Sequence, residues 1–401
     1  MIALATDPDH GQGAAARKLL NHFVGSDVVV AQAKERLNAA LGLPADADLR
    51  PLLGNDLVVA RTRDGLFGAW VVKDPGALRA LVRDRAPDPN VRVVVRGPLL
   101  VAGESGAVGL ALATQARGAG MTRQLFDERL LGLPADALVR AEANVALIPP
   151  VQASKVAWLH SLRRAALTVR ADDAGVHVRA RAEGAPSPPD DIPLAPGATP
   201  PAPLDRSNGA TAGIRDLRQL IRVGLTTLKA SDPGTYRRYD LASRAFKLLR
   251  RGDIEHDVID QLGGTATLWT ADLQTFTLTA PVADPERMTK ALGGLKPIMG
   301  RLLAAAGLQG ARYGVVGTTL VVTTIPSVPL DRLASGSPRR IDSLTGALTG
   351  VVRGATLRRQ LIQRLGLPSI AAFALGPLGD VTFSAQTSTT GIEASGDLAI
   401  H

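Results

Sequence analysis

Short apolar stretches, bounded by turn-forming glycine or aspartate, dominate the hydropathy pattern of the chain. Runs of about four to eight residues between turn signals are typical of β-strands. Asp64-Gly65 and Gly97 separate consecutive stretches, as expected for hairpins, which join antiparallel strands. The strands predicted for the first half are Leu57–Arg61, Leu66–Val72, Arg92–Val95, Leu99–Ala102, Ala137–Leu147, Ala165–Arg170 and Val176–Arg179. The second half repeats the pattern at Thr265–Ala280, Arg312–Thr324 and Val381–Ile400.

Between the strand pairs, apolar residues recur three and four positions apart, which predicts helices. Clear examples are Ala14–Phe23, Pro75–Arg83 and Ala107–Arg117. Aspartate caps the first N–H groups of a helix, and proline suits its first turn. Four Asp-Pro pairs are therefore expected to begin helices and not to act as paired catalytic carboxylates: Asp7, Asp74, Asp232 and Asp284. The predicted fold class is α+β, with antiparallel sheets on which helices pack.

A proline-rich stretch divides the chain of 401 residues, whose length suggests two or three domains. Eight prolines lie between Pro186 and Pro203, a density that neither a helix nor a central strand accommodates. We therefore expect a linker over residues 185–212 and domains over residues 1–184 and 213–401.

Five landmarks recur in the same order in both halves and predict a tandem duplication. They are Thr6–Pro8 with Ser231–Pro233, Leu53–Val59 with Leu262–Leu268, Val71–Pro75 with Pro281–Pro285, Gly97–Val101 with Gly317–Val321, and Gly175–Val178 with Gly391–Ala394. On this alignment Met1 corresponds to Thr226, which apolar chain precedes in the second half. We therefore expect Met1 to follow further, exported or anchoring sequence in a full-length form, with a cytoplasmic chain as the alternative.

Composition excludes several chemistries. The chain has no cysteine, which rules out disulfides, thiolate metal sites and cysteine nucleophiles. No apolar run approaches the roughly 18 residues of a membrane span. The net charge of +9 is explained best by a solvated, arginine-rich surface, with an anionic partner as the alternative. Only 3% of residues are aromatic, so we expect no specific nucleic-acid binding.

Three motifs resemble catalytic or cofactor sites, but each has a structural interpretation that we prefer. Residues 10–16 contain GxGxxA, yet the acidic candidate Asp27 precedes the next apolar run instead of ending it, and no cofactor is expected. Ser105 lies between a strand and a helix, as in a nucleophile elbow, but we expect it to cap the helix. His256 and Asp260 lie four residues apart in an acidic stretch without a second histidine, so no metal site is expected.

Two basic segments are better candidates for a binding surface. Arginines recur every seven residues between Tyr236 and Arg251, and Leu241, Leu248 and Leu249 are expected to face away from them. Such a basic amphipathic helix is typical of binding to anionic lipid or to an acidic partner. The candidate anionic-partner surface comprises Arg237, Arg244, Lys247, Arg251, Arg339, Arg340, Arg358 and Arg359.

Several of these motifs together resemble a known family. The order Thr6-Asp7-Pro8, Leu52–Asp56, Val72–Pro75, Leu99–Gly103 and Leu133–Leu138 is similar to that of the bacterial proteins grouped as domain of unknown function family 3352. The resemblance covers residues 1 to about 150 best. It implies an exported or membrane-anchored envelope protein, and it lends no catalytic residues, since the family has no assigned reaction.

The leading hypothesis is a non-enzymatic envelope protein that binds a ligand, a lipid or a protein partner. The alternatives are a serine hydrolase that uses Ser105 and a binder of anionic polymers through the arginines.

Overall fold

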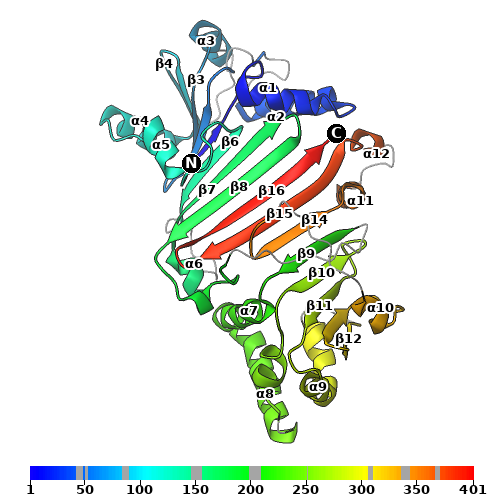
Figure 1. Cartoon of the computed structure of the whole chain (residues 1–401). Coiled ribbons are helices and arrows are strands. Elements are labelled where there is room, and N and C mark those ends of the chain that lie inside the picture. Colours follow the sequence, from blue (N-terminus) through cyan, green and yellow to red (C-terminus); the bar gives the residue numbers. More distant parts are fainter. Residues whose placement is uncertain are drawn as a thin grey trace.

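The computed structural model describes residues 1–41, 48–49, 53–83, 90–145, 156–197, 209–250, 252–305, 310–335, 344–365 and 371–401. Within these ranges sixteen strands form one antiparallel sheet, in the order β12-β13-β11-β10-β9-β14-β15-β16-β8-β7-β6-β1-β2-β3-β5-β4 (Figure 1). The strands are β1 (Ile2–Leu4), β2 (Leu57–Thr62), β3 (Gly65–Val71), β4 (Val91–Arg96), β5 (Leu99–Glu104), β6 (Val139–Asn144), β7 (Leu162–Asp172), β8 (Gly175–Gly184), β9 (Ala210–Ile214), β10 (Ala266–Thr270), β11 (Thr277–Pro281), β12 (Arg312–Val316), β13 (Thr319–Thr323), β14 (Leu348–Val352), β15 (Leu378–Ser388) and β16 (Gly391–Ile400).

Helices connect the strands and make the protein α+β, as the sequence predicts. They are α1 (Gly11–Leu20), α2 (Ser26–Leu41), α3 (Pro75–Arg83), α4 (Ser105–Ala116), α5 (Arg123–Arg129), α6 (Ala157–Ser161), α7 (Leu217–Ser231), α8 (Pro233–Arg250), α9 (Pro285–Ala305), α10 (Leu330–Ala334), α11 (Gly354–Leu365) and α12 (Ala371–Ala374), with the short helical turns η4 (Pro189–Asp191) and η5 (Glu255–Ile259). Helix α3 has the predicted bounds. Strand β9, by contrast, begins at Ala210, inside the range expected to be linker.

The two sets of eight strands follow the same order outward from the centre of the sheet. The first runs β8-β7-β6-β1-β2-β3-β5-β4 and the second β16-β15-β14-β9-β10-β11-β13-β12. Their registers also correspond. The pair Val58–Ala69 of β2 and β3 corresponds to Thr267–Thr279 of β10 and β11. Likewise, Ala69–Val101 of β3 and β5 corresponds to Thr279–Val321 of β11 and β13. Near the centre of the sheet, Arg170–His177 of β7 and β8 corresponds to Gln386–Glu393 of β15 and β16.

The two sets meet where β8 pairs with β16, a junction that we call the seam. It extends from Glu183 opposite Gly391 to Gly175 opposite Ala399. Because two corresponding strands pair antiparallel, equivalent strands run in opposite directions on the two sides of the seam, as they do about a two-fold axis. The strands predicted on either side of the proline-rich stretch thus belong to a single sheet.

Three of the four expected Asp-Pro helix starts are confirmed. Asp74, Asp232 and Asp284 accept hydrogen bonds from backbone N–H groups two or three residues further on, in the first turns of α3, α8 and α9. The prediction for Asp7 is wrong, because its carboxylate accepts from the N–H of Asp9 in a turn and α1 begins at Gly11.

The expected match between Asp7 and Asp232 is wrong as well. Asp7 lies between β1 and α1, whereas Asp232 lies between α7 and α8. The residue that caps α7 is Asp216, whose carboxylate accepts from the N–H groups of Arg218 and Gln219. Strand β1 therefore corresponds to β9, because the two pair in the same register with β6 and β14. The expected match of Met1 with Thr226 is wrong, since Thr226 lies in α7.

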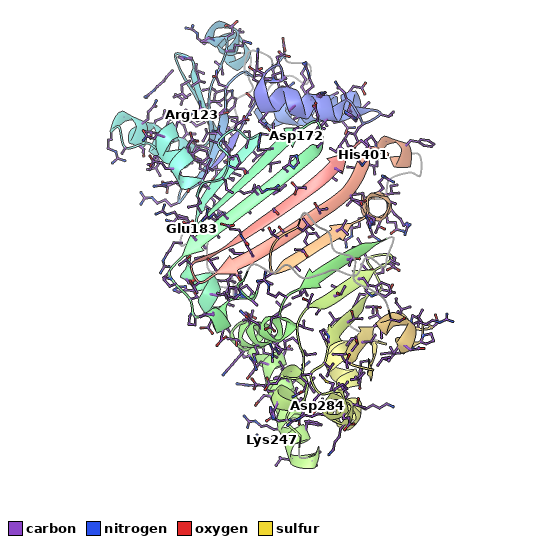
Figure 2. The ribbon with its side chains drawn as sticks, in the orientation of Figure 1. Arg123, Asp172, Glu183, Lys247, Asp284 and His401 are labelled. Carbon is purple, nitrogen blue, oxygen red and sulfur yellow. The ribbon has the colours of Figure 1, made fainter. Side chains whose placement is uncertain are left out.

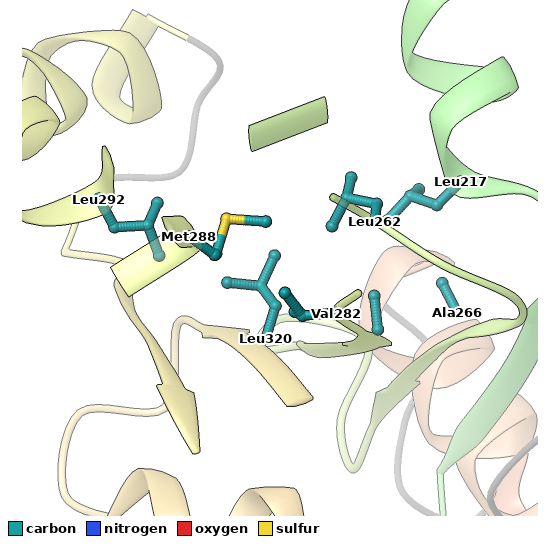
Figure 3. Packing of buried hydrophobic residues seen from close by; sticks show 8 residues of the cluster. Leu217, Leu262, Ala266, Val282, Met288, Leu292 and Leu320 are labelled. Atoms are coloured by element: carbon teal, nitrogen blue, oxygen red, sulfur yellow. The ribbon is translucent and has the colours of Figure 1, made fainter. Parts of the chain in front are cut away.

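Helices pack on both faces of the sheet. We call the face that carries His177, Arg179 and Arg181 of β8 the arginine face, and the opposite face the aliphatic face. On the aliphatic face, α7 and α9 enclose a core against β10, β11 and β13 (Figure 3), formed by Leu217, Leu262, Ala266, Ala280, Val282, Met288, Leu292 and Leu320. On the arginine face, α4 packs on β3, β4 and β5, and α5 packs beside β1. Figure 1 shows the long strands β7, β8, β16 and β15 between these helical ends.

A buried arginine holds α5 against the arginine face. The Arg140 side chain is 4% exposed, and its guanidinium is paired with Asp56 and lies 3.5 Å from Asp127 of α5. It also lies over the ring of Phe126, 5.8 Å from the centroid. Both carboxylates are about one-third exposed, so water solvates them far better than it solvates the guanidinium.

This asymmetry predicts the order of two variants. Arg140→Met leaves two carboxylates that water can reach, whereas Asp56→Asn combined with Asp127→Asn leaves a buried cation without a counter-charge. A buried uncompensated charge costs about 3–5 kcal/mol. We therefore expect the double variant to lower the free energy of unfolding more than Arg140→Met, as measured by urea denaturation. The reverse order would show that Arg140 does not depend on these two carboxylates.

Candidate functional site

The proposed basic surface is divided between separate elements. Arg237, Arg244 and Lys247 lie on α8, which packs on α7 and α9 at one end of the molecule, whereas Arg358 and Arg359 lie on α11 beside β15 (Figure 1). Three further members, Arg251, Arg339 and Arg340, lie outside the described residues. The eight positions therefore do not form one surface in the described part of the chain.

The α11 arginines differ in availability. The Arg358 guanidinium donates to the carbonyl of Gly376, at 3.2 Å, and to that of Leu378, so it fastens α11 to the start of β15. Arg359 is exposed. The α8 cations are freer: Arg244 and Lys247 are 73% and 71% exposed, and each contacts one aspartate, Asp240 at 2.8 Å and Asp253 at 3.3 Å.

The orientation of α8 differs from the sequence expectation. Its buried face is aromatic: Phe246 is 2% exposed and, with Tyr239, packs against Ile254, Ala291 and Leu295. Burial, aided by the charge of Glu255, raises the pKa of Tyr239 to about 12, so the ring stays neutral. The leucines expected to face away from the arginines are not buried behind them: Leu241 is 65%, Leu248 82% and Leu249 77% exposed. The two aromatic rings, seven residues apart, bury more area than the leucines would, and they fix the helix orientation.

The exposed side of α8 thus combines leucines with cations. Arg237, Leu241, Arg244 and Leu248 recur three or four residues apart, so they share one side of the helix. Among the described residues, Arg237 has no ion-pair or hydrogen-bond partner. Figure 2 shows Lys247 at the end of the molecule, away from the central strands. We call the exposed side of α8 with Arg237, Leu241, Arg244, Lys247, Leu248 and Leu249 the α8 surface.

The acidic stretch around η5 is neutralised by cations from neighbouring elements. Arg222 pairs with Asp260 and lies 3.8 Å from Glu255, and Arg287 lies 2.7 Å from Asp257. Burial raises the pKa of Asp257, but hydrogen bonds from the Asp253 backbone and Arg287 outweigh it, so the net pKa is lowered. The described residues contain no group of three His, Cys, Asp or Glu side chains that could hold a metal ion.

Ser105 does not cap α4. The helix begins at Ser105 itself, and the N-cap position is Glu104, whose carboxylate accepts from the N–H of Leu66 at 3.0 Å. The Ser105 side chain is exposed and makes no hydrogen bond to a histidine in the described part of the chain. The GxGxxA segment also has a local role: α1 begins at Gly11, and the Gln12 amide oxygen accepts from the N–H of Ala171 on β7 at 2.8 Å.

The seam carries a polar cluster that the sequence analysis missed. Directly opposite one another on the arginine face lie His177 and Asp397, and Arg181 and Glu393, with Arg179 opposite Ser395 between them. The Asp397 carboxylate lies 2.7 Å from His177 Nδ1 and 2.8 Å from an Arg179 nitrogen. Arg181 Nε lies 3.3 Å from Glu393. The strict alternation of charged and apolar residues in β8 was the available signal, but alternation does not identify the partner strand.

A groove of about 280 Å³ lies over this cluster, lined by Leu133, Arg179, Arg181, Thr345, Ser384, Gln386, Glu393 and Ser395. The charges lining it are paired within the protein, so the groove attracts no strong net charge. On the other side of the His177 ring, the Asp172 carboxylate lies 3.0 Å from Nε2. This distance allows an ion pair, but the direction does not allow a hydrogen bond. Asp397 therefore constrains the ring more than Asp172 does.

No family model matches the chain, and neither a curated protein nor a solved structure matches it. The resemblance to family 3352 stays a prediction. Of the described helices, none has the length and apolar character needed to cross a bilayer.

The seam histidine gives a pH prediction. Burial lowers the pKa of His177, but Asp172 and Asp397 outweigh burial and raise the net pKa above its ordinary value. The stabilisation is thus fully present below about pH 6.5, the ordinary value, and is lost as the pH rises through the raised pKa. The free energy of unfolding should therefore fall by less than about 1 kcal/mol as the pH rises through the raised pKa, and His177→Gln should remove this fall. Urea denaturation between pH 5.5 and 8.5 measures it.

The exposed His22 provides the control, because His22→Gln removes a histidine that makes no ion pair within the described part of the chain. If His177→Gln and His22→Gln leave the same pH profile, the seam pair does not contribute to stability.

Proposed function

We propose that the protein is a non-enzymatic bacterial envelope protein that docks on an anionic lipid surface through α8. The observation that carries the proposal is the exposure of Leu241, Leu248 and Leu249 beside Arg237, Arg244 and Lys247 on one helix. The envelope location rests on the resemblance to family 3352.

The leucines favour a lipid surface over a soluble polyanion. A leucine moved from water into an apolar medium contributes about 1.5–3 kcal/mol, and a cation near an anionic bilayer about 1 kcal/mol. A soluble polyanion uses only the second contribution and leaves the leucines in water. The aromatic rings behind α8 hold the helix on α9 and present its outer side as a fixed surface.

The arrangement of the sheet supports a further part of the proposal, that the two halves are copies of one ancestral unit. The eight strands of each half share their order, their matching register pairs and the Asp-Pro helix starts at Asp74 and Asp284. The helix α2, which corresponds to α8 in the first half, exposes Val28 and Val30 but has a single arginine in its sequence and lacks the arginine–leucine repeat of α8. We therefore assign lipid docking to the second half.

Vesicle co-sedimentation tests the docking proposal. The full chain should bind vesicles of phosphatidylglycerol and phosphatidylcholine, and weakly or not at all vesicles of phosphatidylcholine alone. Replacing Leu241, Leu248 and Leu249 together by Gln should reduce binding at least ~10-fold. Arg237→Gln combined with Arg244→Gln should reduce binding most at low salt. At high salt the attraction of these arginines to the anionic surface is already screened, so their removal changes less.

Two exposed residues outside the α8 surface provide matched controls, Leu66→Gln on β3 and Arg359→Gln on α11. Binding that survives the triple leucine replacement but disappears with soluble polyphosphate as competitor would favour the anionic-polymer alternative. Equal binding to neutral and anionic vesicles would contradict the proposal.

A further inference from the structure

A groove of about 490 Å³ lies at the outer edge of the sheet in the second half, between α9 and β12 (Figure 1). The side chains that line it are Thr289, Leu292, Gly293 and Lys296 of α9 with Tyr313 and Val315 of β12. The two side chains of β12 also pack against the core beneath α9, so they lie on the aliphatic face. The groove is therefore a mainly apolar slot beside a strand edge.

The backbone of β12 is unpaired along this edge. Among the described strands, β12 pairs with β13 alone. On the far side of β13, the N–H of Thr324 donates to the carbonyl of Phe276 at 3.0 Å. Neighbouring residues of a strand direct their N–H and C=O groups to opposite sides, so Thr323 directs its groups to the first residue of β12. The second and fourth residues, Tyr313 and Val315, therefore direct theirs away from β13, where only another extended chain can pair with them.

Gly293 keeps the groove open. In the interior of a helix, glycine is the least favourable residue after proline. Gly293 lies in the middle of α9, and a Cβ atom on it would meet no atom within 4 Å, so neither a close contact nor a positive φ requires glycine there. A larger side chain at this position would enter the groove, so the glycine provides space beside β12.

Lys296 supplies a free charge at the groove. It is exposed, it lies three residues after Gly293 and hence on the same side of α9, and no carboxylate pairs with it in the described part of the chain. A strand added to β12 would place every second side chain against Leu292, Tyr313 and Val315. A carboxylate on the same strand could then pair with Lys296.

We propose that the edge formed by β12 and α9 binds an extended, acidic peptide segment of a protein partner, which adds to the sheet as a further strand. Its alternate apolar side chains fill the groove, and an Asp or Glu side chain pairs with Lys296. The row of outward N–H and C=O groups selects an extended polypeptide over a lipid, because a hydrocarbon chain cannot bond to them. The site shares no residue with the α8 surface, so either proposal can fail without the other.

Selection of displayed heptapeptides on the immobilised full chain tests the proposal. We expect the enriched peptides to alternate apolar and polar residues and to contain Asp or Glu. Gly293→Phe places a ring in the groove and should weaken the most enriched peptide at least ~10-fold in fluorescence anisotropy, whereas Gly224→Phe, at an exposed glycine of α7, should leave binding within ~2-fold. Both replacements raise helix propensity, and a Cβ atom at either position meets no neighbour, so both variants should fold.

The charge pairing has its own control. Lys296→Gln should weaken the peptide ~3-fold, the size expected of an exposed ion pair, and should not affect a peptide whose Asp or Glu is replaced by the amide. Lys290→Gln, at an exposed lysine of α9 outside the groove, should leave both peptides unchanged.

A further measurement uses the wild-type chain alone and N-methylated forms of the most enriched peptide. In an added strand only every second N–H faces β12, so methyl groups at those positions should weaken binding at least ~10-fold and at the intervening positions far less. Equal effects at all positions, no enriched peptide, or binding that Gly293→Phe leaves unchanged in a folded protein would overturn the proposal. Dimerisation of the wild-type chain that Gly293→Phe abolishes, measured by sedimentation, would show that a second copy occupies the groove and would also overturn it.

Discussion

The antiparallel pairing of β8 with β16 is the contact on which the rest of the architecture depends. Every other pair of the described strands lies within one half of the chain, so without this pairing the sheet would end in two long, unpaired edges. Backbone geometry enforces the register. A Cβ atom on Gly175 would lie 1.9 Å from the carbonyl oxygen of Leu398, and one on Gly391 would lie 2.2 Å from that of Ala182. The two glycines occupy corresponding places at opposite ends of the seam, and only glycine allows the strands to approach so closely there.

The charges on the arginine face reinforce this register. His177 faces Asp397 and Arg181 faces Glu393, so a slip of β16 by one residue would turn Asp397 and Glu393 to the aliphatic face and leave His177 and Arg181 without them. The central strands therefore form a polar platform on the arginine face, and the α8 surface lies beyond them at one end of the molecule.

Local patterns predicted the α+β class, most of the strands and helix α3, because turn residues, short apolar runs and helix caps act over a few residues. The misses have a common physical origin in long-range packing. The seam could not be predicted, since alternation in β8 shows that one face is polar but not which strand lies beside it. The wrong face of α8 was chosen because leucines were counted and the burial of Tyr239 and Phe246 was not. Asp7 was paired with Asp232 from the dipeptide alone, although Asp216 occupies the corresponding place.

Hydrogen exchange of the full chain, followed by mass spectrometry, tests the central claim that the seam joins two eight-stranded halves into one sheet. If β8 and β16 pair along their length, their amides exchange only when the whole sheet unfolds, as slowly as those of β7 and β15. Amides of β8 and β16 that exchange much faster than those of β7 and β15 would show that the halves separate in solution, and would contradict the account.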